Sequence, residues 1–312
     1  MRNGTKVALV AALISLTALA AAAQAMHFSA WAPAQKIDEI GGNSSELNTL
    51  FQDGCPIQSP NGLKLYLAST RPRFAGDTRT DLDIWVARRA STSAPWGAPV
   101  NLGEPVNSTA DDFCPTPVRG RGLFFVSRKT TAESCGLGDI YFTRKRTGGW
   151  RQPKHLACGP EGPNSALDEQ GPSYVETDQV LLYFSRSSAS VPGDIYVSEK
   201  LADGSFGPAS PVGELNSSGN DIQPNVRKDG LEIVLSSNRT GTLGGQDVWV
   251  ATRNSVGNLW SAPVNLGDAV NTAAAETRPS LSWDAETLLF GRTPGPEGSG
   301  DIYVSTRTRL GG

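Results

Sequence analysis

The sequence predicts an all-β fold: a five-bladed β-propeller with four antiparallel strands per blade, in which an N-terminal strand joins the last blade and closes the ring. Three observations predict it. A strand-like motif recurs five times at nearly constant spacing, no segment shows sustained helical periodicity, and an outer-strand motif near the N-terminus matches the one missing after the last repeat. The 34 glycines and 21 prolines, spread along the chain, fit many short strands joined by turns.

The first 25 residues have the features of a secretory signal peptide. A basic start and an uncharged apolar run lead to an Ala-Gln-Ala sequence that fits a small-x-small cleavage site. We predict cleavage after Ala25 and a periplasmic or secreted location for the mature chain, which is expected to form one propeller domain over residues 26–312 and to be a monomer. No later apolar run reaches membrane-spanning length, so no membrane span is predicted.

The third strand of each repeat carries the motif that recurs most clearly. It opens with an aspartate and continues in alternation, as in "DIYVSTR", which places apolar side chains on one face of a strand. These aspartates are predicted to bond turn amides within their own blade. The five copies begin, at intervals of 53 to 56 residues, at Asp83, Asp139, Asp194, Asp247 and Asp301.

A second motif precedes the innermost strand of each repeat and has no gaps. It reads Asn, Ser or Thr, three residues, Asp or Glu, two residues, Pro, and it begins at Asn48, Asn107, Asn164, Asn216 and Asn271. An apolar run, the aspartate strand and an aromatic-led segment such as "WGAPVNL" follow it. Four strand-like segments at this period describe a propeller blade, which buries its faces only by stacking on other blades.

The two ends of the chain predict how the ring closes. The last repeat stops after its aspartate strand, whereas the mature N-terminus begins with a spare aromatic-Pro segment, "FSAWAPAQKI". This segment is predicted to supply the outer strand of the fifth blade. Closure leaves only short, protected sheet edges, which a repetitive sheet protein needs to avoid pairing with its neighbours.

The combined repeat resembles the WD-like, TolB-type propeller repeat of bacterial envelope proteins. The motifs that carry the resemblance are the Asn-Ser/Thr turn, the "G-x-DIYV" strand and the "W-x-x-P-V-N-L" segment, and they cover all five repeats. The resemblance implies a periplasmic or secreted protein that binds other proteins or cell-wall material, although enzymes built on related propellers also exist. It carries over no catalytic residue, because no catalytic signature of such an enzyme is present.

Composition narrows the classes of partner and chemistry. The formal charge is −3 and becomes more negative without the basic leader, so nucleic acid and anionic lipid surfaces are not expected partners. Only two histidines occur, His27 and His155, which disfavours a Ser-His-Asp triad and a histidine-ligated metal. No metal and no cofactor are predicted.

The four cysteines of an exported chain suggest two disulfides. Cys55 and Cys114 occupy equivalent positions in adjacent inner strands, and Cys135 and Cys158 flank the later part of the second repeat. We predict the pairs Cys55–Cys114 and Cys135–Cys158. A zinc site is the alternative, which the spacing and the scarcity of histidine disfavour.

Five acids at the starts of the inner strands are expected to ring the mouth of the central channel: Asp53, Asp112, Glu169, Asp221 and Glu276. Such a ring suits a cation site or a carboxylate pair for glycoside hydrolysis. Every repeat also places an arginine after its second strand, which favours a structural interpretation with one arginine neutralising each acid. These arginines are Arg71, Arg128, Arg186, Arg239 and Arg292.

Positions where the repeats differ are the better candidates for specificity. Just before the motif proline the five repeats carry Cys55, Cys114, Gly171, Gln223 and Arg278, and one position earlier they carry Gly54, Phe113, Gln170, Ile222 and Thr277. We predict a binding site at the channel mouth, formed by the five acids with Arg278, Gln223 and Gln170 on one side and Phe113 on the other. Such a site suits a polar or anionic group.

Two functions are consistent with these features. The main prediction is a non-enzymatic binding or scaffold module that takes an envelope protein, a peptide or a glycan on the face that carries the long loops. The alternative is a carboxylate-dependent glycoside hydrolase or polysaccharide lyase. The enzyme requires at least two channel acids without an arginine partner beside an aromatic cleft, whereas a scaffold should show all five acids paired.

Overall fold

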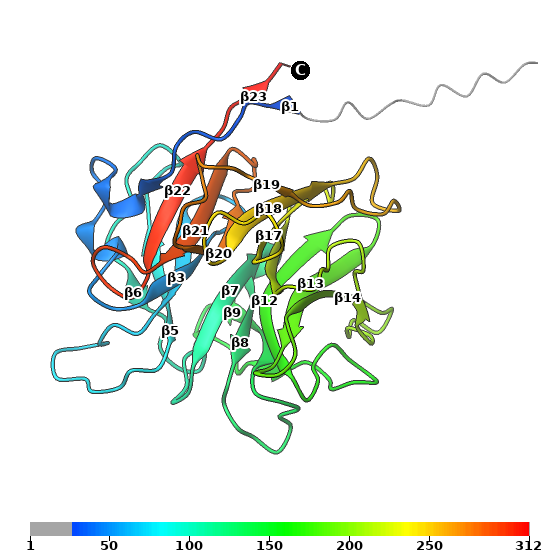
Figure 1. Ribbon diagram of the computed structural model, residues 1–312. Helices are drawn as coiled ribbons and strands as arrows, with labels where there is room; N and C mark the ends of the chain where they lie inside the picture. Colours follow the sequence, from blue (N-terminus) through cyan, green and yellow to red (C-terminus); the bar gives the residue numbers. More distant parts are fainter. Residues whose placement is uncertain (1–26, 312) are drawn as a thin grey trace, which may run out of the picture.

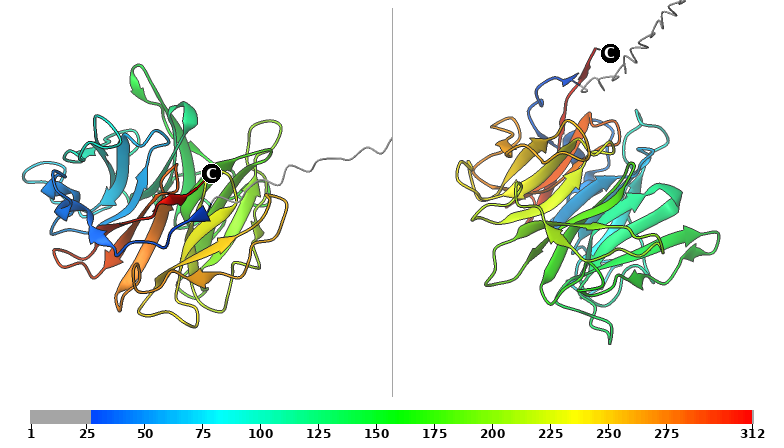
Figure 2. Two further views of the ribbon diagram at one scale, coloured as in Figure 1. Left: turned by 90° about the horizontal axis from the view of Figure 1, so that it is seen from above. Right: turned by 90° about the vertical axis from the view of Figure 1, so that its right-hand side faces the viewer.

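The computed structural model describes residues 27–311 and has the predicted architecture, five small antiparallel sheets arranged as the blades of a propeller (Figure 1). Seen from above, the last blade lies between the first and the fourth, which closes the ring (Figure 2). The predicted signal peptide lies outside the described residues. Within them, no helix is both long and apolar enough to cross a bilayer.

In each blade the first three strands of the repeat lie in chain order from the channel outward. The inner strands are β3 (Asp53–Gln58), β7 (Asp112–Val118), β12 (Asp168–Glu176), β16 (Asp221–Val226) and β20 (Ala275–Leu281). The second strands are β4 (Lys64–Ser69), β8 (Gly122–Ser127), β13 (Val180–Ser187), β17 (Glu232–Ser237) and β21 (Thr287–Thr293). The third strands are β5 (Asp83–Arg88), β9 (Asp139–Arg146), β14 (Asp194–Glu199), β18 (Asp247–Thr252) and β22 (Asp301–Thr306).

The outer strands are only two residues long. They are β6 (Val100–Asn101), β11 (Lys154–His155), β15 (Ser210–Pro211), β19 (Val264–Asn265) and β2 (Gln35–Lys36). The remaining elements are the pair β1 (His27–Phe28) and β23 (Arg309–Leu310), the hairpin strand β10 (Gly149–Trp150), and the short 3-10 turns η1 (Ile37–Glu39), η2 (Ser45–Leu47) and η3 (Arg119–Arg121).

Ring closure follows the prediction. β2, near the N-terminus, pairs antiparallel with β22 of the last repeat, where Gln35 lies opposite Val304. Trp31, which precedes β2, packs against the core shared by blades four and five. A segment near the N-terminus therefore completes the last blade.

Aromatic residues at the start of each outer segment fill the junctions between blades. Trp96 of blade one packs in the core it shares with blade five, Phe206 of blade three lies against blade two, and Trp260 of blade four lies against blade three. Each sheet thus buries its face against the preceding sheet, which explains why the aromatic recurs in every repeat.

The asparagine of each repeat joins its own blade to the preceding one. The side-chain oxygen of Asn271 accepts a hydrogen bond from the Val248 amide at 2.8 Å, and its side-chain nitrogen donates to the Val248 carbonyl at 3.0 Å. Asn48 makes the same pair of bonds to Ile302, at 2.7 and 3.2 Å, across the junction between the last and first blades. Repeating the motif along the chain therefore supplies one such link at every junction.

Both predicted disulfides are present, with Cα–Cα separations of 4.9 Å for Cys55–Cys114 and 5.8 Å for Cys135–Cys158. The first lies in the channel at the junction of blades one and two. At the other four junctions a polar inner-strand side chain bonds to the next inner strand, as Asn225 accepts from the Leu281 amide at 2.9 Å. Blade one carries Ile57 at that position, so the disulfide joins the one pair of inner strands that lacks this hydrogen bond.

A β-bulge interrupts every inner strand just before its proline. The pre-proline residue has a positive φ in all five blades, from 48° at Cys55 and Cys114 to 59° at Gly171. Left-handed backbone is costly for residues other than glycine, yet Gln223 and Arg278 adopt it with φ of 54° and 58°. A bulge re-aims a side chain, and here it turns the variable residue into the channel.

Gly171 is the one glycine among the five bulge residues, and a side chain does not fit at its position. A Cβ added there would lie 2.7 Å from the Gln223 Cα, so Gly171→Ala is expected to lower the free energy of unfolding by about 2 kcal/mol. Gly267→Ala is the matched control, because Gly267 also has positive φ but has no atom within 4 Å of its added Cβ. Chemical denaturation checks this: equal losses in both variants would contradict the close-approach argument.

Candidate functional site at the mouth of the central channel

The five predicted ring acids lie at the channel mouth, but their side chains do not face it. Each is at most 1% exposed, and each accepts a hydrogen bond from the backbone amide of the Ser or Thr four residues earlier. Glu276, for example, accepts from the amide and the hydroxyl of Thr272 at 3.0 and 2.6 Å. The carboxylates therefore hold the turns that lead into the inner strands, as the structural interpretation expects.

Four of the five acids have the predicted arginine partner. Arg186 contacts Glu169 at 2.8 Å, Arg292 contacts Glu276 at 2.7 Å, and the other two pairs are Asp53–Arg71 and Asp221–Arg239. The prediction is wrong for blade two. There Arg128 pairs with Asp111 at 3.1 Å and Asp168 at 2.9 Å, and Asp112 forms no ion pair with any residue in 27–311.

Strand register explains this exception. Asp221 lies opposite Ser237, and its arginine follows that serine by two residues. Asp112 lies opposite Ser127, but Arg128 follows immediately, so its side chain points to the other face of the strand. The position equivalent to Arg239 is taken by Lys129, whose amide donates to the Ser127 hydroxyl at 3.2 Å as the amide of Arg239 does to Ser237.

Asp112 is consequently a buried carboxylate without a cationic partner. The pKa of Asp112 is raised to about 6, mainly by burial of its carboxylate. Burial also raises the pKa of Glu169 to about 7, against the opposing effects of Ser165 and Arg186. Asp112 lines a cavity of about 380 Å³ between blades one and two, together with Glu133, Tyr141 and Lys129.

The channel itself is narrow. Its centre encloses about 30 Å³, lined by the five bulge residues and the five motif prolines, which is room for little more than a water molecule. Any ligand larger than this must therefore bind at the mouth and does not pass through the channel.

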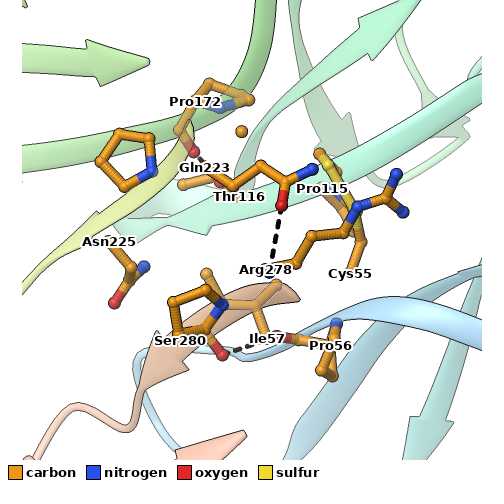
Figure 3. A pocket seen from close by; sticks show the side chains of 14 residues that line it. Cys55, Pro56, Ile57, Pro115, Thr116, Pro172, Gln223, Asn225, Arg278 and Ser280 are labelled. Carbon is orange, nitrogen blue, oxygen red and sulfur yellow. Dashed lines mark hydrogen bonds between the residues drawn. A yellow bond between two sulfur atoms is a disulfide. The ribbon is translucent and has the colours of Figure 1, made fainter. Parts of the chain in front are cut away.

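Arg278 dominates the mouth. Its side chain extends across the channel toward Cys55 of blade one (Figure 3), and it lines a cavity of about 240 Å³ between blades five and one. It makes no ion pair with a carboxylate of the described residues, and burial is the main cause that lowers its pKa to about 10. A strained backbone thus holds a guanidinium without a direct ion-pair partner in a small cavity, where Asp111 and Asp168 act on it only from a longer distance.

The other predicted mouth residues surround Arg278. The Gln223 side-chain oxygen accepts from the Arg278 amide at 3.1 Å, and the Gln223 side-chain nitrogen donates to Gln170 at 3.3 Å. The ring centre of Phe113 lies 5.7 Å from the guanidinium carbon of Arg278 and 5.0 Å from that of Arg128. The structure therefore brings these four predicted residues together and turns the five acids away from them.

Sequence reasoning missed the network of Arg128 with Asp111 and Asp168. A signal was available, because only the second and third repeats place another acid directly before the motif acid, in the pairs "DD" and "DE". One channel acid, Asp112, has no arginine partner within residues 27–311. An enzyme was expected to have at least two such acids and a scaffold none, so the structure meets neither expectation.

Comparison with known proteins identifies the fold but no family. No protein-family model matches the sequence, and no curated protein matches it. Among solved structures the chain is similar to a thermostable family-43 glycoside hydrolase, with a TM-score of 0.55 and 13% identity over 86% of this chain and 93% of that one.

Two further solved structures give the same result. One is an alpha-L-arabinofuranosidase from Lactobacillus brevis, with a TM-score of 0.54 and 11% identity over 84% of this chain and 92% of that one. The other is an alpha-L-arabinofuranosidase from Podospora anserina, with a TM-score of 0.53 and 10% identity over 90% of this chain and 97% of that one. At these identities the likeness shows a shared five-bladed propeller fold.

Proposed function

We propose that this protein is an exported propeller that binds glycans bearing an acidic group at the mouth of its central channel, without cleaving them. The observation that carries the proposal is the unpaired guanidinium of Arg278, held in a cavity by a left-handed bulge. Guanidinium groups bind carboxylates in a planar, two-point geometry, so an acidic sugar supplies the missing counter-charge.

Three observations support a glycan as the ligand and export as the setting. The similar solved structures are glycoside hydrolases, which favours carbohydrate over protein as the ligand class. The repeat's resemblance to TolB-type propellers supports a role in binding. Two disulfides and a leader-like N-terminal sequence fit a protein that works in an oxidising compartment.

The geometry supports binding over hydrolysis. Glycoside hydrolysis needs two carboxyl groups that reach the scissile bond from opposite sides. The ring acids here are buried, and four of them are bound to arginines, so they do not reach a ligand at the mouth.

Arg278→Ala is expected to weaken binding of a uronate-containing oligosaccharide about tenfold or more, because a charge-assisted contact is lost. Calorimetric titration against hits from a glycan array measures this, and neutral oligosaccharides should be unaffected. Arg309→Ala is the control, an exposed arginine in the terminal strand β23. Unchanged affinity in a folded Arg278→Ala protein would refute the proposed site.

Hydrolysis is the second candidate, favoured by the similar solved structures and by Asp112. A carboxylic acid with a pKa of about 6 suits a general acid, and Glu133 lines the same cavity as a second carboxylate. Release of reducing sugar from a panel of arabinan, xylan and uronan substrates, lost in Asp112→Asn, would favour this function over binding alone.

A further inference from the structure

A basic cavity lies on the opposite face of the propeller, between blades one and two. It has a volume of about 770 Å³ and is formed by the β3–β4 hairpin, the β7–β8 turn and the end of β9. Six cationic residues line it and no Asp or Glu does, although the whole chain carries a net negative charge. The six are Lys64, Arg88, Arg119, Arg121, Lys145 and Arg146.

These cations share one cavity without a carboxylate among them to neutralise their charge. None of the six forms an ion pair within 4.0 Å in residues 27–311, whereas the arginines at the channel mouth in four blades are each bound to a buried acid. Burial, followed by the charges of Arg88, Lys145 and Arg121, lowers the pKa of Lys64. Like charges gathered in a cavity repel each other, and an anionic ligand would remove that repulsion.

The sequence of blade two departs from the repeat at this cavity. The turn between the first two strands carries Asn61, Asp178, Asp229 or Asp284 in the other blades, and these polar side chains bond their own turns in several of them. Blade two carries Arg119 at this position, with Arg121 two residues later. Gly120 and Arg121 both have positive φ, 72° and 63°, whereas the turns of blades one, four and five have one such residue each, so blade two differs here in backbone as well as in side chains.

Further donors and an aromatic surface complete the cavity. The indole nitrogen of Trp150, which lines it, is buried and has no hydrogen-bond partner among the residues that the structure describes. The ammonium of Lys145 lies 5.7 Å from the centre of the same ring. Buried donors are normally satisfied, so a free indole N–H beside six cations indicates a place for an acceptor group.

We propose that this cavity binds a small ligand that carries several phosphate or sulfate groups. Its volume lies in the range of small-molecule sites, which favours a compact sugar or polyol over a nucleic-acid duplex. Six cations favour a ligand with several anionic groups over a ligand with one, because one phosphate or sulfate group is usually bound by only one or two basic side chains. The site is separate from Arg278 and does not depend on the function proposed for the channel mouth.

Inositol hexakisphosphate and a sulfated disaccharide are suitable probes, titrated into the folded protein by calorimetry. Arg121→Ala/Lys145→Ala is expected to weaken binding about tenfold or more, and the wild-type affinity should fall as salt rises, because the attraction is electrostatic. Lys129→Ala/Arg309→Ala is the matched control, which removes two exposed cations that do not line this cavity and should bind as the wild type does.

Vesicles of phosphatidylcholine with and without phosphatidylinositol bisphosphate distinguish a free ligand from a lipid headgroup. Binding to either source, lost in the cavity variant and kept in the control, supports the site. Equal loss in both double variants, or no binding of any probe, overturns it. Tighter binding to a duplex DNA oligomer than to the small probes would overturn the assignment of ligand class.

Discussion

Asn48→Ala is expected to lower the free energy of unfolding by about 3 kcal/mol, because it opens the junction that closes the ring. The Asn48 amide satisfies both the N–H and the carbonyl of Ile302, and the residue is 4% exposed. Alanine leaves two buried backbone groups unpaired, each costing about 1–3 kcal/mol. Urea unfolding of the variant measures the loss.

Asn271→Ala is the comparison variant, because it removes the same kind of asparagine at a junction that does not close the ring. Asn271 makes the same two bonds to Val248, but it links blades that are adjacent in the chain. A smaller loss is expected for Asn271→Ala, because the Val248 carbonyl also accepts from the Leu266 amide at 3.1 Å, so only the Val248 N–H is left unpaired. A loss below about 0.5 kcal/mol for Asn48→Ala, the range of an ordinary surface substitution, would contradict the role given to this amide.

The sequence predicts most of this fold because the repeat occurs five times and each copy forms one blade. The aspartate strands, the asparagine turns and the N-terminal strand that completes the last blade all follow from motifs whose spacing is visible without coordinates. The Cys55–Cys114 disulfide follows from the same register, since the two cysteines stand at equivalent positions in neighbouring inner strands.

The direction in which each side chain points could not be predicted from the repeat. Arg128 looks like the fifth member of an arginine series, yet a one-residue offset sends it to the other face of its strand, toward Asp168. The bulge before each proline turns Gln223 and Arg278 into the channel, and no sequence pattern showed the positive φ that does so. The basic cavity arises from three segments of blades one and two that meet only in the fold.

Asp112→Asn is expected to stabilise the protein near pH 7 by up to about 3 kcal/mol, because it removes a buried charge that has no cationic partner. The folded-state pKa of Asp112, about 6, is raised above the ordinary aspartate value of 3.8. The folded protein therefore holds this proton more tightly than the unfolded chain does. The stability that the proton contributes is fully present below about pH 4 and is lost as the pH rises to about 6.

Denaturant unfolding of both proteins between pH 4 and pH 8 checks this difference, which should be near zero at the acidic end and largest at neutral pH. Asp221→Asn is the opposing control, because Asp221 is bound to Arg239 and its loss leaves a largely buried guanidinium without a carboxylate partner. That variant should be destabilised at pH 7. If Asp112→Asn were destabilised as well, the Asp112 carboxylate would have to be stabilised as an anion, and the same finding would remove it as the proton donor of the hydrolytic alternative.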